Sequence, residues 1–429
     1  MYALAFDLGT TTLAASLIDL ADGTRLAMAG SINPQRRFGS DVVSRLEAAV
    51  ASETVLQEMS GLVRKELWRL ARELLQAGSR DLRQVSRVAV AGNPAMQHIL
   101  LGLPVDSLAR PPFRPVCTGG TRLSTAALQW DADIPLYILP MPGGFVGGDT
   151  VAFLYGQQGY GQTNQPLKQG LFSTTSAAPP TVYLDLGTNG EMALVADTTI
   201  WATSAAAGPA FEGGNLSCGM PALPGAISSV RIEGERLSLS VIGSGTPTGI
   251  CGSAAIEIIH ELLRAGIIDS SGRLLDSLET DAGIGNRIIS QQGENVFVLY
   301  RDARTLLTIS QADIRQVQLA KGAIRAGLEV LAGHANLPLE TIESVVLTGS
   351  FGAVLRPEWL KTIGIFDESM LHITRFAPEG ALTGVETALL AHDDFASLER
   401  LAGRFRVVPL SGTPLFEQAF MRTIDFPAS

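Results

Sequence analysis

Cysteine is scarce in this chain of 429 residues, which contains only three. Cys117, Cys218 and Cys251 are odd in number and far apart, so they argue against a disulfide framework and fit a reducing, cytoplasmic setting. Three scattered thiols also cannot supply the four local thiolates of an iron–sulfur cluster. We therefore expect a cytoplasmic protein with no iron–sulfur cluster in this chain.

Long apolar runs and a basic surface are also missing. No uninterrupted apolar stretch is long enough to span a bilayer, and no charged segment followed by an apolar one marks a signal peptide at the start. Lysine and arginine number 32 against 42 aspartates and glutamates, which gives a net charge of −10. This balance argues against a nucleic acid or an anionic membrane as the main partner.

Two common functional motifs are absent as well. The sequence has no G-x-x-x-x-G-K followed by Ser or Thr, which excludes a P-loop protein. Its five histidines show no ligand spacing, so they form no recognisable metal motif. With 46% hydrophobic and 17% charged residues the composition is globular, and the length predicts two or three domains.

What the sequence does contain is the tetrapeptide Asp-Leu-Gly-Thr, twice. The first copy is Asp7-Leu8-Gly9-Thr10, continued by Thr11 and Thr12, and the second is Asp185-Leu186-Gly187-Thr188, continued by Asn189 and Gly190. Each copy lies between two short apolar runs, at 2–6 and 13–18 in the first case and at 181–184 and 191–195 in the second. The pattern predicts two strand–turn–strand hairpins.

The chemistry of such a hairpin suits phosphate. A carboxylate at the strand end can hold Mg²⁺ directly or through water, and glycine lets the backbone approach an anion closely. The threonines after it offer hydroxyl and N–H donors to phosphate oxygens. A single copy is more often an ordinary turn, because Asp, Gly and Thr are turn residues. Two copies in matched contexts favour phosphate binding.

Two further echoes support a duplication. Residues 88–93 resemble residues 345–350, and both predict a buried strand that breaks at glycine before a helix. Residues 146–152 are echoed by residues 383–388, each with Gly-x-(Asp/Glu)-Thr opening a helix. Three matched elements in one order predict two related α/β halves that face one site.

The composition along the chain suggests where these halves end. We expect a first half at 1–156, a flexible linker or loop at 157–180, a second half at 181–390 with an insertion at about 215–310, and a tail at 391–429 packed on the second half. Apolar spacing predicts an amphipathic helix around 62–74 and a helix at 251–265. A long helix is expected from about Ser310 to His334, and Ser310 with Asp313 forms a capping pattern at its start.

Two glycine-rich segments are candidates for further site residues. In the small-residue run 205–214, Gly208 would let the backbone approach a ligand, and Glu212 would orient water or metal. A crowded packing contact explains the small residues there but not the carboxylate. Gly249–Gly252 precedes a helix, where free N–H groups suit an anion and where glycine is equally suited to tight packing.

A third segment lies at the end of a predicted strand, where open α/β sheets bind ligands. It consists of Gly349, Ser350, Phe351 and Gly352, whose backbone would let a nucleoside lie flat. Lys321, in the long helix before it, would reach the base or a phosphate, although a solvated lysine is the ordinary interpretation.

Together these motifs resemble the actin, heat-shock-protein and sugar-kinase (ASKHA) superfamily of ATPases. This resemblance implies two duplicated α/β halves of the RNase H-like, actin-like kind, with a nucleotide cleft between the lobes. Within it the sequence is most similar to the ATPase domain of reductive activators of corrinoid proteins. The segments that carry the resemblance are 7–12, Asn33-Pro34-Gln35 with 39–42, 146–149, 185–191, 206–213, Cys218-Gly219-Met220, 249–252 and 348–352. They extend over essentially the whole chain.

The resemblance implies an ATP-dependent reduction of a corrinoid protein from Co(II) to Co(I). Asp7 and Asp185 would position Mg²⁺ and water, and Glu212 would complete the catalytic set. The nucleotide would be held by Gly9, Thr10, Thr11, Thr12, Gly187, Thr188, Asn189, Gly190, Gly208, Lys321, Gly349, Ser350, Phe351 and Gly352. The implied partners are a corrinoid protein and an external ferredoxin-like electron donor, with neither nucleic acid nor membrane, while homodimerisation stays open.

The sequence departs from the family pattern in two ways. Family members usually carry an N-terminal 2Fe–2S domain, whereas here the ATPase hairpin begins at residue 2, so either the chain is a fragment or a separate ferredoxin supplies the electron. Pro221 stands where the pattern after Cys-Gly-Met typically has arginine.

Two alternative functions also remain. One is a small-molecule kinase of the same superfamily, and the other is a nucleotide-switched interaction module without redox chemistry.

Overall fold

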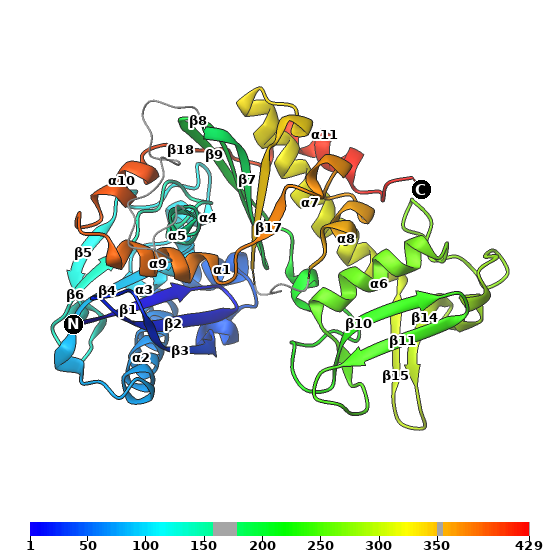
Figure 1. Ribbon diagram of the computed structural model, residues 1–429, viewed down its shortest axis with the longest axis horizontal. Coiled ribbons are helices and arrows are strands. Elements are labelled where there is room, and N and C mark those ends of the chain that lie inside the picture. Colours follow the sequence, from blue (N-terminus) through cyan, green and yellow to red (C-terminus); the bar gives the residue numbers. More distant parts are fainter. Residues whose placement is uncertain (158–177, 350–354, 429) are drawn as a thin grey trace. The chain divides into compact units, whose positions relative to one another are not determined.

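The structure is a computed structural model that describes residues 1–157, 178–349 and 355–428 (Figure 1). Of the predicted linker at 157–180, residues 158–177 lie outside the described residues.

The described residues form both strands and helices. The strands are β1 (Tyr2–Leu8), β2 (Thr12–Asp19), β3 (Arg25–Ile32), β4 (Val85–Gly92), β5 (Thr121–Ser124), β6 (Pro135–Ile138), β7 (Ala178–Leu186), β8 (Gly190–Asp197), β9 (Thr199–Ala205), β10 (Ala226–Glu233), β11 (Arg236–Val241), β12 (Gly249–Ile250), β13 (Ile288–Gln291), β14 (Glu294–Arg301), β15 (Leu306–Ser310), β16 (Ser344–Thr348), β17 (Thr374–Phe376) and β18 (Phe405–Val407). The helices are α1 (Val42–Ala51), α2 (Glu53–Ala77), α3 (Pro94–Leu101), α4 (Asp106–Ala109), α5 (Gly148–Gly156), α6 (Gly252–Arg264), α7 (Gln311–Ala335), α8 (Pro357–Thr362), α9 (Gly380–Leu390), α10 (Ala396–Ala402) and α11 (Pro414–Thr423).

The first large sheet has the strand order β3-β2-β1-β4-β6-β5. The first three strands form an antiparallel meander, and β4 then pairs in parallel with β1. β6 continues the parallel part, while β5 closes the edge in the antiparallel direction. Residues 3–6 of β1 are fully buried, as expected for an apolar central strand covered on both faces.

The second large sheet has the order β17-β16-β7-β8-β9-β18. Taken from β9 to β17, it repeats the succession β3-β2-β1-β4-β6 of the first sheet. The parallel pairs also match in register, because Asp7 of β1 lies opposite Ala91 of β4 and Asp185 of β7 lies opposite Thr348 of β16. Ala91 and Thr348 are the residues that the sequence echo aligns. The predicted duplication of an α/β half is therefore confirmed.

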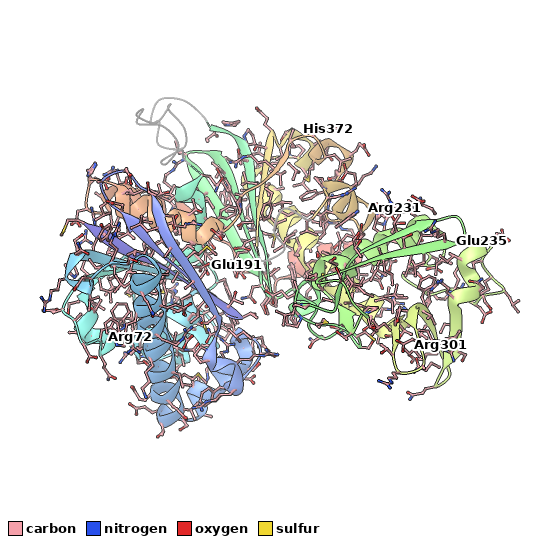
Figure 2. The ribbon with its side chains drawn as sticks, turned by 60° about the horizontal axis from the view of Figure 1, so that its bottom comes forward. Arg72, Glu191, Arg231, Glu235, Arg301 and His372 are labelled. Atoms are coloured by element: carbon pink, nitrogen blue, oxygen red, sulfur yellow. The ribbon has the colours of Figure 1, made fainter. Side chains whose placement is uncertain are left out.

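The predicted insertion at 215–310 contains two small three-stranded sheets. Their orders are β11-β10-β12 and β13-β14-β15, and α6 packs on β10. Figure 2 labels Arg231 and Glu235, which come from β10 and from the turn between β10 and β11. The backbone of β10 is further fixed from α6, where the carboxylates of Glu257 and Glu261 accept hydrogen bonds from Val230 N and Ile232 N.

The chain divides into two compact units that differ from the expected halves. Unit 1 consists of Met1–Pro179, Val195–Thr203 and Glu379–Pro409, and unit 2 consists of Pro180–Leu194, Ser204–Pro378 and Leu410–Ser429. α9 belongs to unit 1 because it packs on α5, β1, β2 and β4. The predicted tail is also divided, since β18 pairs with β9 in unit 1 whereas α11 packs on α7 in unit 2.

The contact between α5 and α9 is a close helix crossing within unit 1 (Figure 1). A Cβ atom at Gly384 of α9 would overlap the backbone carbonyl of Ala152 in α5. A Cβ at Gly156, at the end of α5, would lie 2.8 Å from the backbone nitrogen of Gly384. The two backbones therefore touch directly, and glycine is required at both positions.

The two longest helices of the described residues, α2 and α7, have different surroundings. α2 is amphipathic, as predicted, and its outer face carries exposed Arg72, labelled in Figure 2. α7 begins after Ser310, whose hydroxyl accepts from Asp313 N while the Asp313 carboxylate accepts from Ser310 N. This capping box confirms the predicted helix start. No helix in the described ranges is long and apolar enough to cross a membrane.

The crossing of α5 and α9 predicts a large effect of a small substitution. Gly384→Ala should lower the free energy of unfolding by about 2 kcal/mol or more, because a methyl group must displace the backbone of α5. The effect is measured as a lower midpoint of thermal unfolding.

The matched control is Gly333→Ala in α7, where a Cβ would meet no atom within 4 Å. There alanine should stabilise the helix by roughly 0.5–1 kcal/mol, because glycine is a poor helix former. Equal unfolding midpoints for the two variants would contradict the direct backbone contact.

Candidate functional site

The first Asp-Leu-Gly-Thr segment forms the tight turn between β1 and β2. Asp7 is the second-last residue of β1 and is half-buried, Thr10 is buried and Thr12 is exposed. A Cβ at Gly9 would lie only 2.5 Å from the carbonyl oxygen of Thr12. Glycine is therefore required for the turn, and it leaves the backbone open to close approach by an anion.

Two asparagines hold this turn in place. Asn33 Nδ2 donates to Gly9 O at 2.9 Å, and Asn93 Nδ2 donates to Thr10 Oγ1 at 2.9 Å. Both asparagines are also helix caps, since Asn33 Oδ1 accepts from Gln35 N and Asn93 Oδ1 accepts from Met96 N. The sequence marks Asn33-Pro34 and Asn93-Pro94 only as turns, and their second function becomes visible once β4 lies beside β1.

A further carboxylate, Asp149, lies at the carboxyl end of β4. It is the second residue of α5, and a Cβ at neighbouring Gly147 would come within 2.5 Å of Asn93 Cα and 2.9 Å of Asp149 Oδ1. Thr150 N donates to Asp149 Oδ1 at 2.7 Å. Burial raises the pKa of Asp149 to about 6, and the bonds from Thr150 only partly oppose this shift. Asp149 therefore lies in the same unit as the first hairpin, next to the asparagine that holds it.

The corresponding acidic residue of the second echo has another role. Glu386 in α9 accepts from Arg25 Nε at 2.7 Å and from Arg25 Nη2 at 2.9 Å, and Ser16 Oγ also donates to it. Arg25 additionally pairs with Glu379. All four residues belong to unit 1. Both copies of the motif therefore lie in helices, α5 and α9, but the charge of Glu386 is neutralised by the ion pair with Arg25.

The second Asp-Leu-Gly-Thr segment forms the turn between β7 and β8 in unit 2. Gly187 N donates to Asn189 O at 3.2 Å. Buried Thr188 donates its hydroxyl to a carboxylate oxygen of Glu212, and the other oxygen lies 3.6 Å from the Cβ position of Gly187. The structure thus brings the predicted catalytic Glu212 to the predicted phosphate turn. Figure 2 labels Glu191, the half-buried residue that follows this turn on β8.

Gly349 lies beside the carboxylate of Asp185. Its φ angle is +126°, and a Cβ there would be 3.2 Å from Asp185 Oδ1 and 2.5 Å from Leu186 O. Parallel pairing of β7 with β16 produces this approach. Ser350, Phe351 and Gly352 lie outside the described residues.

Gly208 lies directly before the short 3-10 helix that ends at Glu212. Its φ angle is +76°, a backbone conformation that favours glycine, so this residue allows the chain to turn into that helix.

The segment Gly249–Gly252 is explained by packing. A Cβ at Gly252 would overlap the carbonyl oxygen of Phe211, and one at Gly249 would lie 2.7 Å from Met220 Sδ. The start of α6 is therefore pressed against the residues next to Glu212. Of the two sequence interpretations, an anion site or close packing, the structure supplies the physical reason for close packing.

Lys321 is fully buried in α7 and is engaged by the C-terminal segment. Its Nζ donates to Thr423 O at 2.6 Å and to Asp425 O, and it lies 5.2 Å from the ring centroid of Phe426. Burial lowers the pKa of Lys321 to about 8, with the Asp425 carboxylate opposing the shift and Arg325 adding to it. These bonds give Lys321 a structural role in unit 2, and its assignment to nucleotide stays a prediction.

Side chains that bind transition metals do not gather in the described ranges. Among the residues that the structure describes, no three His, Cys, Asp or Glu side chains form a group that could hold a metal ion. A cation that keeps most of its waters and binds phosphate oxygens, as Mg²⁺ does, needs few protein carboxylates. The predicted role of Asp7 and Asp185 therefore does not depend on such a group.

Two protein-family models match this chain. The model of the RACo middle region matches residues 2–159, and the model of the C-terminal domain of RACo, described as the ASKHA domain, matches residues 179–429. The second match alone covers more than half of the chain.

Three individual proteins that are similar to this chain agree with these family matches. The chain is 29% identical to the corrinoid activation enzyme RamQ of Eubacterium limosum, over 99% of this chain and 70% of that protein. It is 24% identical to the Co(II) methylated amine-specific corrinoid protein reductase of Methanosarcina barkeri, over 85% of this chain and 65% of that protein. A solved structure of a reductive activator for corrinoid, iron–sulfur protein superposes with a TM-score of 0.85 at 28% identity, over 100% of this chain and 66% of that chain. This chain thus spans about two thirds of the length of these relatives.

The buried lysine predicts a pH dependence of stability. Between pH 8 and pH 10.5, folded Lys321 has lost a proton that the unfolded chain still holds, so stability rises with pH across this window. When the pH is lowered, this gain is lost between pH 10.5 and pH 8 and does not change further below pH 8. The free energy of unfolding of the wild type, minus that of Lys321→Met, should therefore increase by about 2 kcal/mol from pH 7 to pH 10. Chemical denaturation at both pH values measures it.

The control is Lys361→Met, which removes a lysine whose side chain is 45% exposed and pairs with Glu368 on the surface. Its difference from the wild type should stay constant between the two pH values. A constant difference for Lys321→Met as well would show that burial does not perturb this lysine.

Proposed function

The chain belongs to the RACo family, and on that premise we propose that it is an ATP-dependent reductive activator of a corrinoid protein. The observation that carries the proposal is the relationship to a corrinoid activation enzyme over 99% of this chain. In the proposed reaction, ATP is hydrolysed to ADP and phosphate while one electron reduces the corrinoid cobalt from Co(II) to Co(I). The reduction is uphill with cellular donors, so nucleotide must favour a conformation of the activator in which the reduced state is reached.

Each hairpin would bind phosphate oxygens. In unit 1 the donors would be the backbone and hydroxyl groups of Thr10, Thr11 and Thr12, and in unit 2 those of Thr188, Asn189 and Gly190. The support for this role is the tight turn at Gly9 and the bonds that hold Gly9 and Thr10 from Asn33 and Asn93. A prearranged set of donors stabilises charge that develops on a transferring phosphoryl group, without reorganising during the reaction.

The carboxylates fit a magnesium ion. Asp7 and Asp185 are the second-last residues of two register-equivalent strands, one in each unit, and both are only half-buried. We propose that each of them serves as a ligand of Mg²⁺, directly or through water. When bound, the ion would neutralise charge on the phosphates.

Asp149 and Glu212 are the candidates for orienting the attacking water. Glu212 accepts from the Thr188 hydroxyl, which fixes its carboxylate at the second turn. Asp149 lies beside Asn93 in unit 1, and burial keeps its pKa near 6, closer to neutral than an ordinary carboxyl. A carboxylate with a raised pKa is a better proton acceptor, as general base catalysis requires. We therefore add Asp149 to the predicted catalytic set.

The electron would come from outside this chain. Its three cysteines cannot hold a four-thiolate cluster, so a separate iron–sulfur protein or domain of ferredoxin type is proposed as the donor. Adenosine binding is assigned to Gly349, on the basis of its position beside Asp185, and to Ser350, Phe351 and Gly352 from the sequence.

The hairpin assignment predicts that Asp7→Asn and Asp185→Asn each lower the rate of ATP hydrolysis at least about 100-fold. The physical reason is the loss of a charged ligand for Mg²⁺ without a change in side-chain volume. Phosphate release measures turnover, and circular dichroism with thermal unfolding shows that the fold is retained.

Asp22→Asn and Asp302→Asn are matched controls, one in each unit. Both aspartates are exposed and accept backbone hydrogen bonds in turns, from Thr24 N and from Arg304 N respectively. An asparagine preserves such bonds, so turnover should stay within about twofold of the wild type. Undiminished turnover in both hairpin variants would remove the basis of the assignment.

The proposed activity predicts a change in the absorbance spectrum of a corrinoid protein. With ATP, Mg²⁺, an external one-electron donor and this chain, the Co(II) spectrum should convert to the Co(I) spectrum. Without ATP, or with Asp185→Asn, the Co(II) spectrum should persist.

Candidate corrinoid proteins are tested one by one, and ATP hydrolysis is followed in the same samples. Hydrolysis that is stimulated by a corrinoid protein supports the activator. Hydrolysis that is stimulated by a small-molecule phosphate acceptor and not by any corrinoid protein would instead identify a kinase.

A further inference from the structure

Unit 1 contains a buried arginine to which the proposed chemistry gives no role. Arg45 is in α1, and its side chain is fully buried in unit 1. Burial lowers the pKa of Arg45 to about 10, and the nearby Asp41 carboxylate opposes the shift only in part. Burying a cation is costly because the charge loses its hydration, so a residue of this kind needs a compensating role.

The hydrogen bonds of Arg45 go to groups that carry no net charge. Its Nε donates to Gly39 O at 3.0 Å, and its Nη1 donates to Met96 Sδ at 3.4 Å. Nη2 has no partner among the described residues. Asp41 does not supply one, because its carboxylate accepts from Ser44 N and Ser44 Oγ at the start of α1.

Met96 connects Arg45 to both asparagines of the hairpin. Asn33 Nδ2, which donates to Gly9 O, also approaches Met96 Sδ at 3.7 Å. Met96 N donates to Asn93, whose side chain holds the Thr10 hydroxyl. Arg45 and Asn33 thus share one sulfur atom, and the residue that carries it is bonded to Asn93.

We propose that Arg45 is a positioning residue for the phosphate-binding turn. It fixes Met96 through the sulfur atom, and through Met96 it fixes Asn33 and Asn93, which hold Gly9 O and Thr10 Oγ1. Arg45 itself touches neither Gly9 nor Thr10 through any of its described bonds. Its effect is therefore on the geometry of the turn and appears in the binding of phosphate groups rather than of the nucleoside.

This inference rests on the proposed nucleotide site, and the experiment separates the two. Dissociation constants of ADP and of adenosine are measured for the full chain by displacement of a fluorescent ATP analogue. In Arg45→Met the constant for ADP should rise about tenfold, while that for adenosine should stay within about twofold. A variant that merely destabilises unit 1 would not change the ratio of the two constants.

Arg64→Met is the matched control. Arg64 is a partly buried arginine of unit 1, its pKa is also lowered by burial, and its Nε donates to a backbone carbonyl, Leu100 O, at 2.8 Å. Leu100 is at the far end of α3 from Met96. The ratio of the ADP and adenosine constants should be unchanged in this variant.

Met96→Leu provides a second variant that keeps the volume of the site and removes only the shared sulfur. It should raise the ADP constant in the same direction, by about threefold. If Arg45→Met does not fold, this variant decides the question. A ratio in Arg45→Met equal to that of Arg64→Met and the wild type would overturn the role of Arg45, and so would an equal ratio in Met96→Leu if Arg45→Met does not fold. Failure of the wild type to bind the analogue or ADP would instead contradict the proposed function.

Discussion

Parallel pairing of a hairpin strand with the next parallel strand of its sheet is the constraint on which the rest of the structure depends. Parallel strands end at the same edge, so whatever follows β1 meets whatever follows β4, and the same holds for β7 and β16. Asn93 reaches Thr10, and Gly349 reaches Asp185, only because this register is kept. A slip of one residue would turn each aspartate to the opposite face of its sheet.

Much of this arrangement could be predicted from the sequence. The two hairpins, the strands that pair with them and the start of α7 depend on local signals, namely apolar runs, turn residues and a capping pattern. The ASKHA fold and the relationship to reductive activators depend on motif order, and the RACo family matches confirm both. The contact between Glu212 and Thr188 is also of a kind that the sequence could predict, because both residues belong to predicted motifs of one half.

The remainder depends on contacts between distant segments, which local patterns do not encode. Asn33 and Asn93 look like ordinary turn residues until β3 pairs with β2 and β4 pairs with β1 in the folded sheet. Lys321 has the sequence context of a solvated helix residue, yet the last residues of the chain bury it. Glu386 repeats Asp149 in its motif but meets Arg25 from β3, a residue that no spacing rule associates with it. α9 likewise returns to unit 1 because of the face it buries, not because of its place in the sequence.

The crossing of α5 and α9 has a mechanical consequence. Two helices that meet through side chains can slide by small amounts past one another, because the side chains between them can change rotamers. At Gly384 and Ala152 the backbones are in direct contact, so no layer of side chains is available to yield. The close backbone contact at Gly384 and Gly156 therefore restricts sliding of α5 against α9. It also links the helix that begins beside Asp149 to the helix that carries Glu386, the partner of Arg25.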